Sequence, residues 1–194
     1  MSTIKNILFS GVGGQGILLA SELTAAALLQ VGYDVKKSEV HGMAQRGGSV
    51  TAQLRYGERV YSPLIDPGTA DIQMAFEMME AVRYLPYLNQ DSTVIVNTQK
   101  ILPPSVATGQ AVYPENVLDE LEKREIRVIG VDAFSIAKQA GEVRTANVAL
   151  VGALSVHLDV DVQVFESIIE QRVPQRFLKE NMKAFAGGRE AGGR

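Results

Sequence analysis

The chain has 194 residues, of which 46% are hydrophobic, so it can bury one substantial core, and its formal net charge of −3 offers no basic surplus for a nucleic-acid partner. It contains no cysteine, which excludes disulfides, thiol nucleophiles and iron–sulfur clusters held by its own thiolates. The two histidines, His41 and His157, are far apart and lack a metal-ligand spacing, so we expect no metal site in this chain.

Two apolar stretches could in principle direct the chain to a membrane, and neither fits. Residues 1–10 lack the pattern of a signal peptide. Residues 17–31 are interrupted by polar side chains and are shorter than the ~20 residues that cross a bilayer. We therefore expect a cytoplasmic protein with neither a membrane nor a nucleic-acid partner.

Strand and helix patterns alternate along the first half of the chain. The clearest signals are an Ala/Leu-rich segment ended by Gly32 and a polar–apolar alternation over residues 49–56. Gly57-Glu58 predicts a hairpin turn that leads into a short return strand. The expected elements are strands at 4–10, 33–40, 49–56 and 59–62, and a helix at 16–31.

The second half continues the alternation and then becomes helical. We expect residues 1–186 to form a single domain, with the glycine-rich residues 187–194 as a flexible, frayed C-terminal tail. The expected elements of this half are strands at 70–76, 92–97 and 126–131, and helices at 77–88, 114–123, 133–140, 145–157 and 162–185.

This order of elements predicts an α/β, three-layer, Rossmann-like fold with a mostly parallel sheet and an antiparallel hairpin edge. In such folds ligands and partners approach the carboxyl ends of the strands. We expect that edge to collect the loop at 11–16, the loop at 39–48 and Asn97.

The loop after the first strand is the strongest local signal. Gly11, Gly13 and Gly16 satisfy GxGxxG between a strand and a helix, where backbone N–H groups at the positive end of a helix can bind an anion. A self-contained NAD(P)- or flavin-dependent oxidoreductase would also need an acid at the end of the second strand. Asp34 lies at its start and Glu39 at its end, slightly late. A self-contained oxidoreductase of this kind is the alternative hypothesis.

A second segment is more specific. Residues 38–50, Ser-Glu-Val-His-Gly-Met-Ala-Gln-Arg-Gly-Gly-Ser-Val, together with the glycine loop resemble the gamma-type subunit or domain of 2-oxoacid:ferredoxin oxidoreductases. Within this family the chain is most similar to the subunits that serve indolepyruvate, which implies an arylpyruvate substrate. The similarity covers nearly the whole chain in order and includes residues 70–71, 75–77, 94–97 and 147–153.

The resemblance implies a division of labour, because this chain lacks the Gly-Asp-Gly…Asn segment that holds thiamine diphosphate and lacks every cluster ligand. A large alpha subunit would carry thiamine diphosphate, Mg²⁺ and the iron–sulfur clusters and would pass electrons to ferredoxin. This chain, inactive alone, would cover and shape the site, with coenzyme A as a shared ligand. Without its partner it is expected to self-associate as a homodimer. A pure assembly module, with an empty glycine turn, stays open.

The candidate residues follow from both segments, and none is expected to be catalytic. Arg46 and the Gly13–Gly16 amides could bind a phosphate or carboxylate of the substrate or of coenzyme A, or Arg46 could pair with Glu39 or with a partner carboxylate, which we favour. Asn97 could orient a ligand or end its strand by bonding backbone. The expected binding set is Gly11, Gly13, Gly14, Gln15, Gly16, Glu39, Gln45, Arg46, Gly47, Gly48 and Asn97.

Overall fold

The computed structural model describes residues 4–41, 48–100, 102, 106, 109, 112–113 and 116–193. The strands are β1 (Lys5–Val12), β2 (Asp34–His41), β3 (Ser49–Gly57), β4 (Ile72–Ala75), β5 (Thr93–Asn97) and β6 (Arg127–Val131). The helices are α1 (Ile17–Gln30), α2 (Met78–Arg83), α4 (Val117–Glu122), α5 (Ala133–Ala140), α6 (Ala146–Ser155), α7 (Val162–Arg172) and α8 (Leu178–Gly192).

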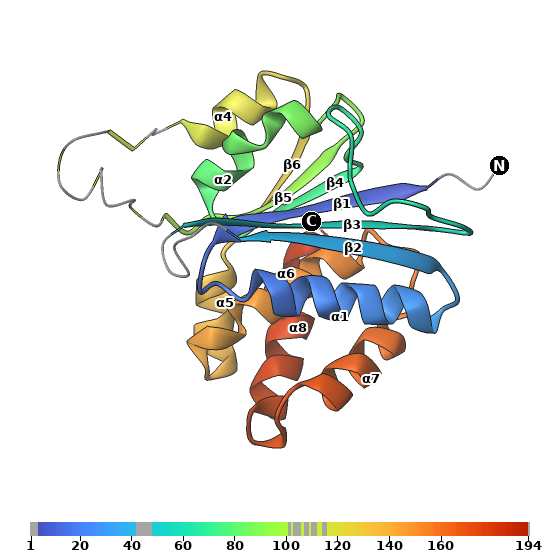
Figure 1. The fold of residues 1–194 in the computed structure, drawn as a ribbon. Helices are drawn as coiled ribbons and strands as arrows, with labels where there is room; N and C mark the ends of the chain where they lie inside the picture. The colour runs from blue at the N-terminus through green and yellow to red at the C-terminus, as the bar shows by residue number, and fades with distance from the viewer. Residues whose placement is uncertain are drawn as a thin grey trace.

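The six strands form one sheet between two helical layers, as Figure 1 shows. Helices α2 and α4 cover one face, and α1, α5, α6, α7 and α8 lie on the other. Strand β1 is buried from both sides, because Ile7 and Phe9 belong to the core beneath α1 and α6 whereas Leu8 belongs to the core beneath α2. The predicted three-layer α/β fold is confirmed.

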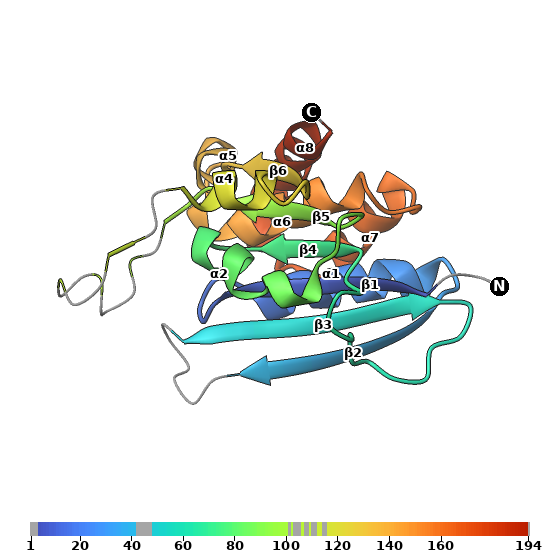
Figure 2. The same cartoon turned by 90° about the horizontal axis from the view of Figure 1, so that it is seen from above.

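The strand order is β2-β3-β1-β4-β5-β6. Strands β1, β4, β5 and β6 run parallel to one another, whereas β3 runs antiparallel to both β1 and β2 (Figure 2). The mostly parallel sheet with an antiparallel edge is thus confirmed. The edge pair is β2 with β3.

The predicted return strand at residues 59–62 is wrong. The backbone N–H of Val60 donates to Asp34 at 2.8 Å, and the Arg55 guanidinium donates to the carbonyl oxygens of Ser62 and Leu64, both at 3.1 Å. Side-chain hydrogen bonds hold this loop in place of backbone pairing between strands. Pro63, which follows directly, has no N–H to donate to a neighbouring strand.

The C-terminal helices differ from the expectation in two ways. The predicted helix at 162–185 is broken, because Pro174 lacks an N–H and holds Val173 in an extended conformation with φ −93° and ψ 137°. The predicted frayed tail at 187–194 is also wrong as far as the structure describes it. Helix α8 continues to Gly192, and Gly188 and Gly192 are buried in it.

Two further helices are shorter than expected. The predicted helix at 77–88 ends at Arg83 and is followed by a 3₁₀ turn, Leu85–Tyr87, which contains Pro86. The predicted helix at 114–123 begins at Val117 in the structure, and Pro114 lies outside the described residues. Among the described residues, no helix has the length and apolar character needed to cross a bilayer.

Candidate functional site

A cavity of about 400 Å³ opens at the edge of the sheet where the parallel strands end, which we call the carboxyl edge. Its volume falls within the ~300–1,000 Å³ that is usual for small-molecule sites. The turn between β1 and α1, the ends of β4 and β5 and the start of α6 surround it. Four of the predicted residues line it: Gly14, Gln15, Gly16 and Asn97. The residues that line it without having been predicted include Arg144 and Asn147.

The glycines of the turn are needed for two different reasons. Gly14 and Gly16 have φ of 103° and 78°, the left-handed region that other residues rarely adopt. At Gly11 a side chain has no room, because a Cβ would lie 2.8 Å from both the Phe76 Cβ and the Gln15 Oε1. The sequence pattern therefore encodes a tight turn packed against the end of β4.

Several backbone amides of this turn are already engaged within the protein. The Val12 N–H donates to Gln15 Oε1 at 2.7 Å, the Gly13 N–H to the Gly48 carbonyl at 2.8 Å and the Gln15 N–H to the Val12 carbonyl at 3.2 Å. Gly48, a predicted site residue, thus contacts the turn directly. An anion at this turn would therefore meet the amides of Gly14 and Gly16 and the first turn of α1.

Gln15 and Asn97 meet at one carbonyl group. Gln15 Nε2 and Asn97 Nδ2 donate to the Phe76 carbonyl at 2.8 and 3.1 Å. Asn97, which is 2% exposed, also accepts a hydrogen bond from the Ala133 N–H at 3.3 Å. Of the two roles open for Asn97, these contacts favour the one at the strand end, where it ties β4, β5 and α5 together.

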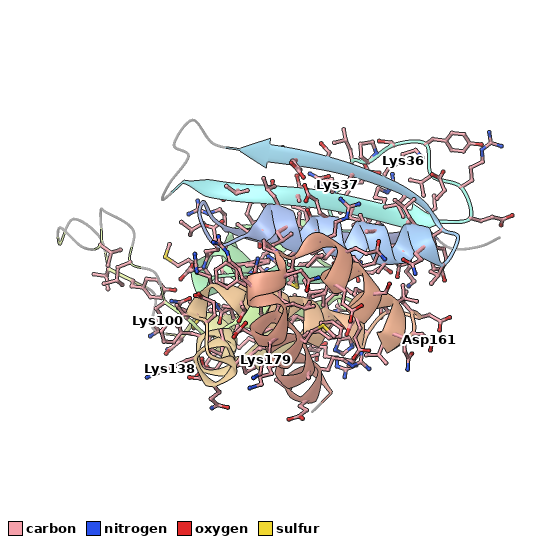
Figure 3. The ribbon with its side chains drawn as sticks, turned by 90° about the horizontal axis from the view of Figure 1, so that it is seen from below. Lys36, Lys37, Lys100, Lys138, Asp161 and Lys179 are labelled. Atoms are coloured by element: carbon pink, nitrogen blue, oxygen red, sulfur yellow. The ribbon has the colours of Figure 1, made fainter. Side chains whose placement is uncertain are left out.

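Glu39 lies away from this cavity. It is in register with Ala52 and Phe9, two strands from β1, which is roughly 10 Å at the usual strand spacing. Glu39 pairs with Lys37 at 2.6 Å, and Lys37 points from β2 toward α1 (Figure 3). Three other predicted site residues, together with the His41 side chain, lie outside the described part of the chain: Gln45, Arg46 and Gly47.

The sheet order bears on the dinucleotide alternative. In a dinucleotide fold, the strand beside β1 is parallel to it and ends in the acid that binds the ribose. Here that place is taken by β3, which is antiparallel and begins with Ser49 and Val50 at the carboxyl edge. Asp34 lies at the opposite end of the sheet, where its hydrogen bond with Lys36 lowers its pKa. Strand β3, the strand that takes this place, contains no Asp or Glu that could bind a ribose beside the glycine turn.

Arg144 is the charged residue of the cavity that the sequence did not reveal. It binds Glu142 through two nitrogens, Nε at 3.0 Å and one terminal nitrogen at 2.6 Å, and this pairing lowers the pKa of Glu142 to about 2. The guanidinium also lies 4.9 Å from the centre of the Phe177 ring. Nothing local marks Arg144, because it lines the same cavity as the glycine turn only through tertiary packing, although the adjacent segment 147–153 carried part of the resemblance.

Asn147 closes the base of the turn. A Cβ on Gly16 would lie 2.4 Å from Asn147 Nδ2, so the start of α6 and the turn are in direct contact. At the mouth of the cavity two apolar side chains remain exposed, Phe134 at 42% and Val143 at 46%. Among the described residues no cluster of three or more His, Cys, Asp or Glu could hold a metal ion.

Known proteins resemble this chain over almost its full length. The chain is 43% identical over 187 residues to the indolepyruvate oxidoreductase subunit IorB of Archaeoglobus fulgidus, covering 94% of this chain and 92% of that protein. It is 42% identical over 193 residues to the subunit of the same name in Thermococcus kodakarensis, covering 96% of this chain and 95% of that protein.

A solved structure shows the same fold. The pyruvate oxidoreductase subunit PORC of Thermotoga maritima matches with a TM-score of 0.75 and 24% identity, over 96% of each chain. The sequence profile of the pyruvate ferredoxin/flavodoxin oxidoreductase family matches residues 6–191. These matches confirm the resemblance to subunits of 2-oxoacid:ferredoxin oxidoreductases. The chain therefore belongs to the pyruvate ferredoxin/flavodoxin oxidoreductase family.

Proposed function

We propose that this chain is the small subunit of an enzyme that oxidatively decarboxylates indolepyruvate, or a related arylpyruvate, to an acyl-CoA with ferredoxin as electron acceptor. The IorB relatives support the choice of substrate. The observation that carries the role is the cavity at the carboxyl edge, which joins the glycine turn to Arg144. Ligands of α/β folds enter at this edge.

In this proposal the large partner subunit holds thiamine diphosphate, Mg²⁺ and the iron–sulfur clusters, which supply the decarboxylation and the path for electrons. This chain covers and shapes the site and keeps water from it. The exposed Phe134 and Val143 at the cavity mouth fit a surface that a partner covers. The same two side chains would favour self-association when the chain is alone.

Coenzyme A is the proposed shared ligand. Arg144, which is paired with Glu142, and the amides of Gly14 and Gly16 place hydrogen-bond donors around one cavity, as a phosphate requires. A structure that matches this fold, with a TM-score of 0.76 over 31% of its own chain, is the 2-oxoglutarate:ferredoxin oxidoreductase of Magnetococcus marinus with 2-oxoglutarate, coenzyme A and succinyl-CoA bound.

The deciding experiment is reconstitution. The large subunit would be assayed for indolepyruvate-dependent viologen reduction in the presence of coenzyme A, with and without this chain. We expect activity only when both are present. Full activity of the large subunit alone would refute the proposal, and binding of NAD(P) or a flavin by this chain alone would favour the self-contained alternative.

A further inference from the structure

Glu80 on α2 is a buried carboxylate that the proposed function does not use. The residue is 3% exposed. A carboxylate so far from water requires partners, because burial of an uncompensated charge is costly. Its two oxygens have them: Oε1 accepts from Arg83 Nε at 2.8 Å and Oε2 accepts from the Ser49 hydroxyl at 2.5 Å.

Ser49 connects this carboxylate to the glycine turn. Its hydroxyl has a single proton, which it donates to Glu80, so the contact with the Tyr84 hydroxyl at 3.0 Å is one in which Tyr84 donates. Ser49 is thus held from two sides at the first position of β3. The carbonyl group immediately before it, that of Gly48, accepts the hydrogen bond from the Gly13 N–H.

Glu80 is also linked to the turn through β1, by its backbone carbonyl group. The backbone carbonyl of Glu80 accepts from Gln73 Nε2 at 3.1 Å and from the Ser10 hydroxyl at 3.4 Å, and Gln73 Nε2 donates to Ser10 Oγ at 2.9 Å. Ser10 directly precedes Gly11. Glu80 therefore contacts both strands that meet at the turn, β1 with its backbone and β3 with its side chain.

We propose that Glu80 is a positioning residue that holds the glycine turn at the cavity through Ser49 and Ser10. A carboxylate suits this place because it accepts two hydrogen bonds and donates none, whereas a glutamine would turn an N–H toward either Ser49 or Arg83. The effect on catalysis rests on the proposed function of the cavity. The effect on the turn does not, so the two can be measured separately.

The first measurement is hydrogen exchange of the full chain over residues 10–17. In Glu80→Gln and in Ser49→Ala we expect exchange in this segment to be about tenfold faster, as the loss of one charge-assisted hydrogen bond permits. Ser49→Thr, which keeps the hydroxyl, should restore the slow exchange. Hydrogen exchange in α6 reports whether the variants remain folded. If Glu80→Gln unfolds the chain, the test rests on Ser49→Ala, which is the milder change.

The matched control is Glu120→Gln. Glu120 pairs with Lys123 at 2.8 Å, three residues on, as Glu80 does with Arg83. Its side chain is 53% exposed, against 5% for Glu80. The Glu120→Gln variant should leave the hydrogen exchange of residues 10–17 unchanged. Unchanged exchange in both Glu80→Gln and Ser49→Ala would overturn the proposal, whatever the reconstituted complex does.

The second measurement is indolepyruvate-dependent viologen reduction by the complex with the large subunit. We expect kcat/KM to fall about tenfold in Glu80→Gln and Ser49→Ala and to recover in Ser49→Thr. Faster exchange with unchanged kcat/KM would also overturn the proposal, because the turn would then need no fixed position. Failure of the proposed function is recognised independently, by a large subunit that is fully active without this chain.

Discussion

The chain has two glycine-rich segments, 11–16 and 187–193, which are similar in composition but have different structural roles. In the turn, Gly14 and Gly16 supply positive φ angles at the cavity. In α8, Gly188 and Gly192 sit in a regular helix and allow it to approach α6. A glycine can be required because the backbone has a positive φ or because another part of the chain packs closely against it. Only the residues that surround it in space show which of the two reasons applies.

The spaces around the glycines show this difference. A Cβ on Gly14 would meet nothing within 4 Å, whereas a Cβ on Gly188 would lie 1.8 Å from the carbonyl oxygen of Ala149. The contact is reciprocal, since a Cβ on Gly152 of α6 would lie 2.1 Å from the carbonyl oxygen of Phe185. The segment that was predicted to fray is thus packed backbone against backbone.

The largest expected effect is that of Gly188→Ala. The added methyl group collides with backbone that cannot rotate away, so we expect the free energy of unfolding to fall by about 3 kcal/mol, the upper end of the usual cost of overpacking. Urea unfolding of the isolated chain measures it. Gly193→Ala is the control, because its Cβ would meet only Arg189 O, at 3.4 Å, and should change stability by less than about 0.5 kcal/mol. Equal effects would contradict the close α6–α8 contact.

Gly16→Ala should destabilise the chain by about 2 kcal/mol, since it combines left-handed strain with a clash against Asn147. Gly14→Ala carries the strain alone and should cost about 1 kcal/mol. Adding Asn147→Ala to Gly16→Ala should recover part of the loss. A double-mutant cycle by urea unfolding measures this coupling, and additive effects would show that Asn147 does not confine the turn.

Arg144→Ala tests whether the turn, unlike α8, belongs to a ligand site. In the reconstituted complex we expect the KM for coenzyme A to rise about tenfold, the effect of one lost charged hydrogen bond, with assembly unchanged. Arg176→Ala is the matched control, because Arg176 also lies over Phe177, at 4.7 Å, but does not line the cavity. A similar KM in both variants would remove Arg144 from the site.

Arg46→Ala is the companion measurement for the residue chosen from sequence. The KM for coenzyme A reads a ligand contact, and the affinity for the large subunit reads an interface contact, which is the role that we favour. We therefore expect weaker assembly with a smaller change in KM. If both values stay at those of the unmodified chain, Arg46 has neither role.

The smallest effect is expected at the end of α8. His157 Nε2 lies 3.1 Å from the Gly192 carbonyl, and burial lowers the pKa of His157, with Arg127 adding to the shift. The unfolded chain then binds more protons below about pH 6.5, so stability that is present above this pH is lost as the pH falls. Unfolding free energies at pH 7.5 and 5.5 should differ more in the unmodified chain than in His157→Gln. The difference is small because water screens the half-buried ring.

Local sequence was sufficient for most elements and for the turn. The apolar run at 4–10 predicts β1, Gly32 ends α1, and the glycine spacing places a tight turn between them. Pro174 also carried a signal for the end of α7, which the long apolar periodicity concealed. The family resemblance was readable in the same way, because residues 10–16 and 38–50 form specific local motifs.

The tertiary structure decided which strands are neighbours and which glycines allow close contact between helices. The insertion of β3 between β1 and β2 moved Glu39 away from the turn, and pairing between strands depends on contacts that no local pattern encodes. Asn147 contacts Gly16, and Arg144 lines the same cavity, each from more than a hundred positions away in the chain. The sequence by itself determined the turn and most of the strands and helices around it, whereas only packing over long separations decided what surrounds the turn and why α8 is rich in glycine.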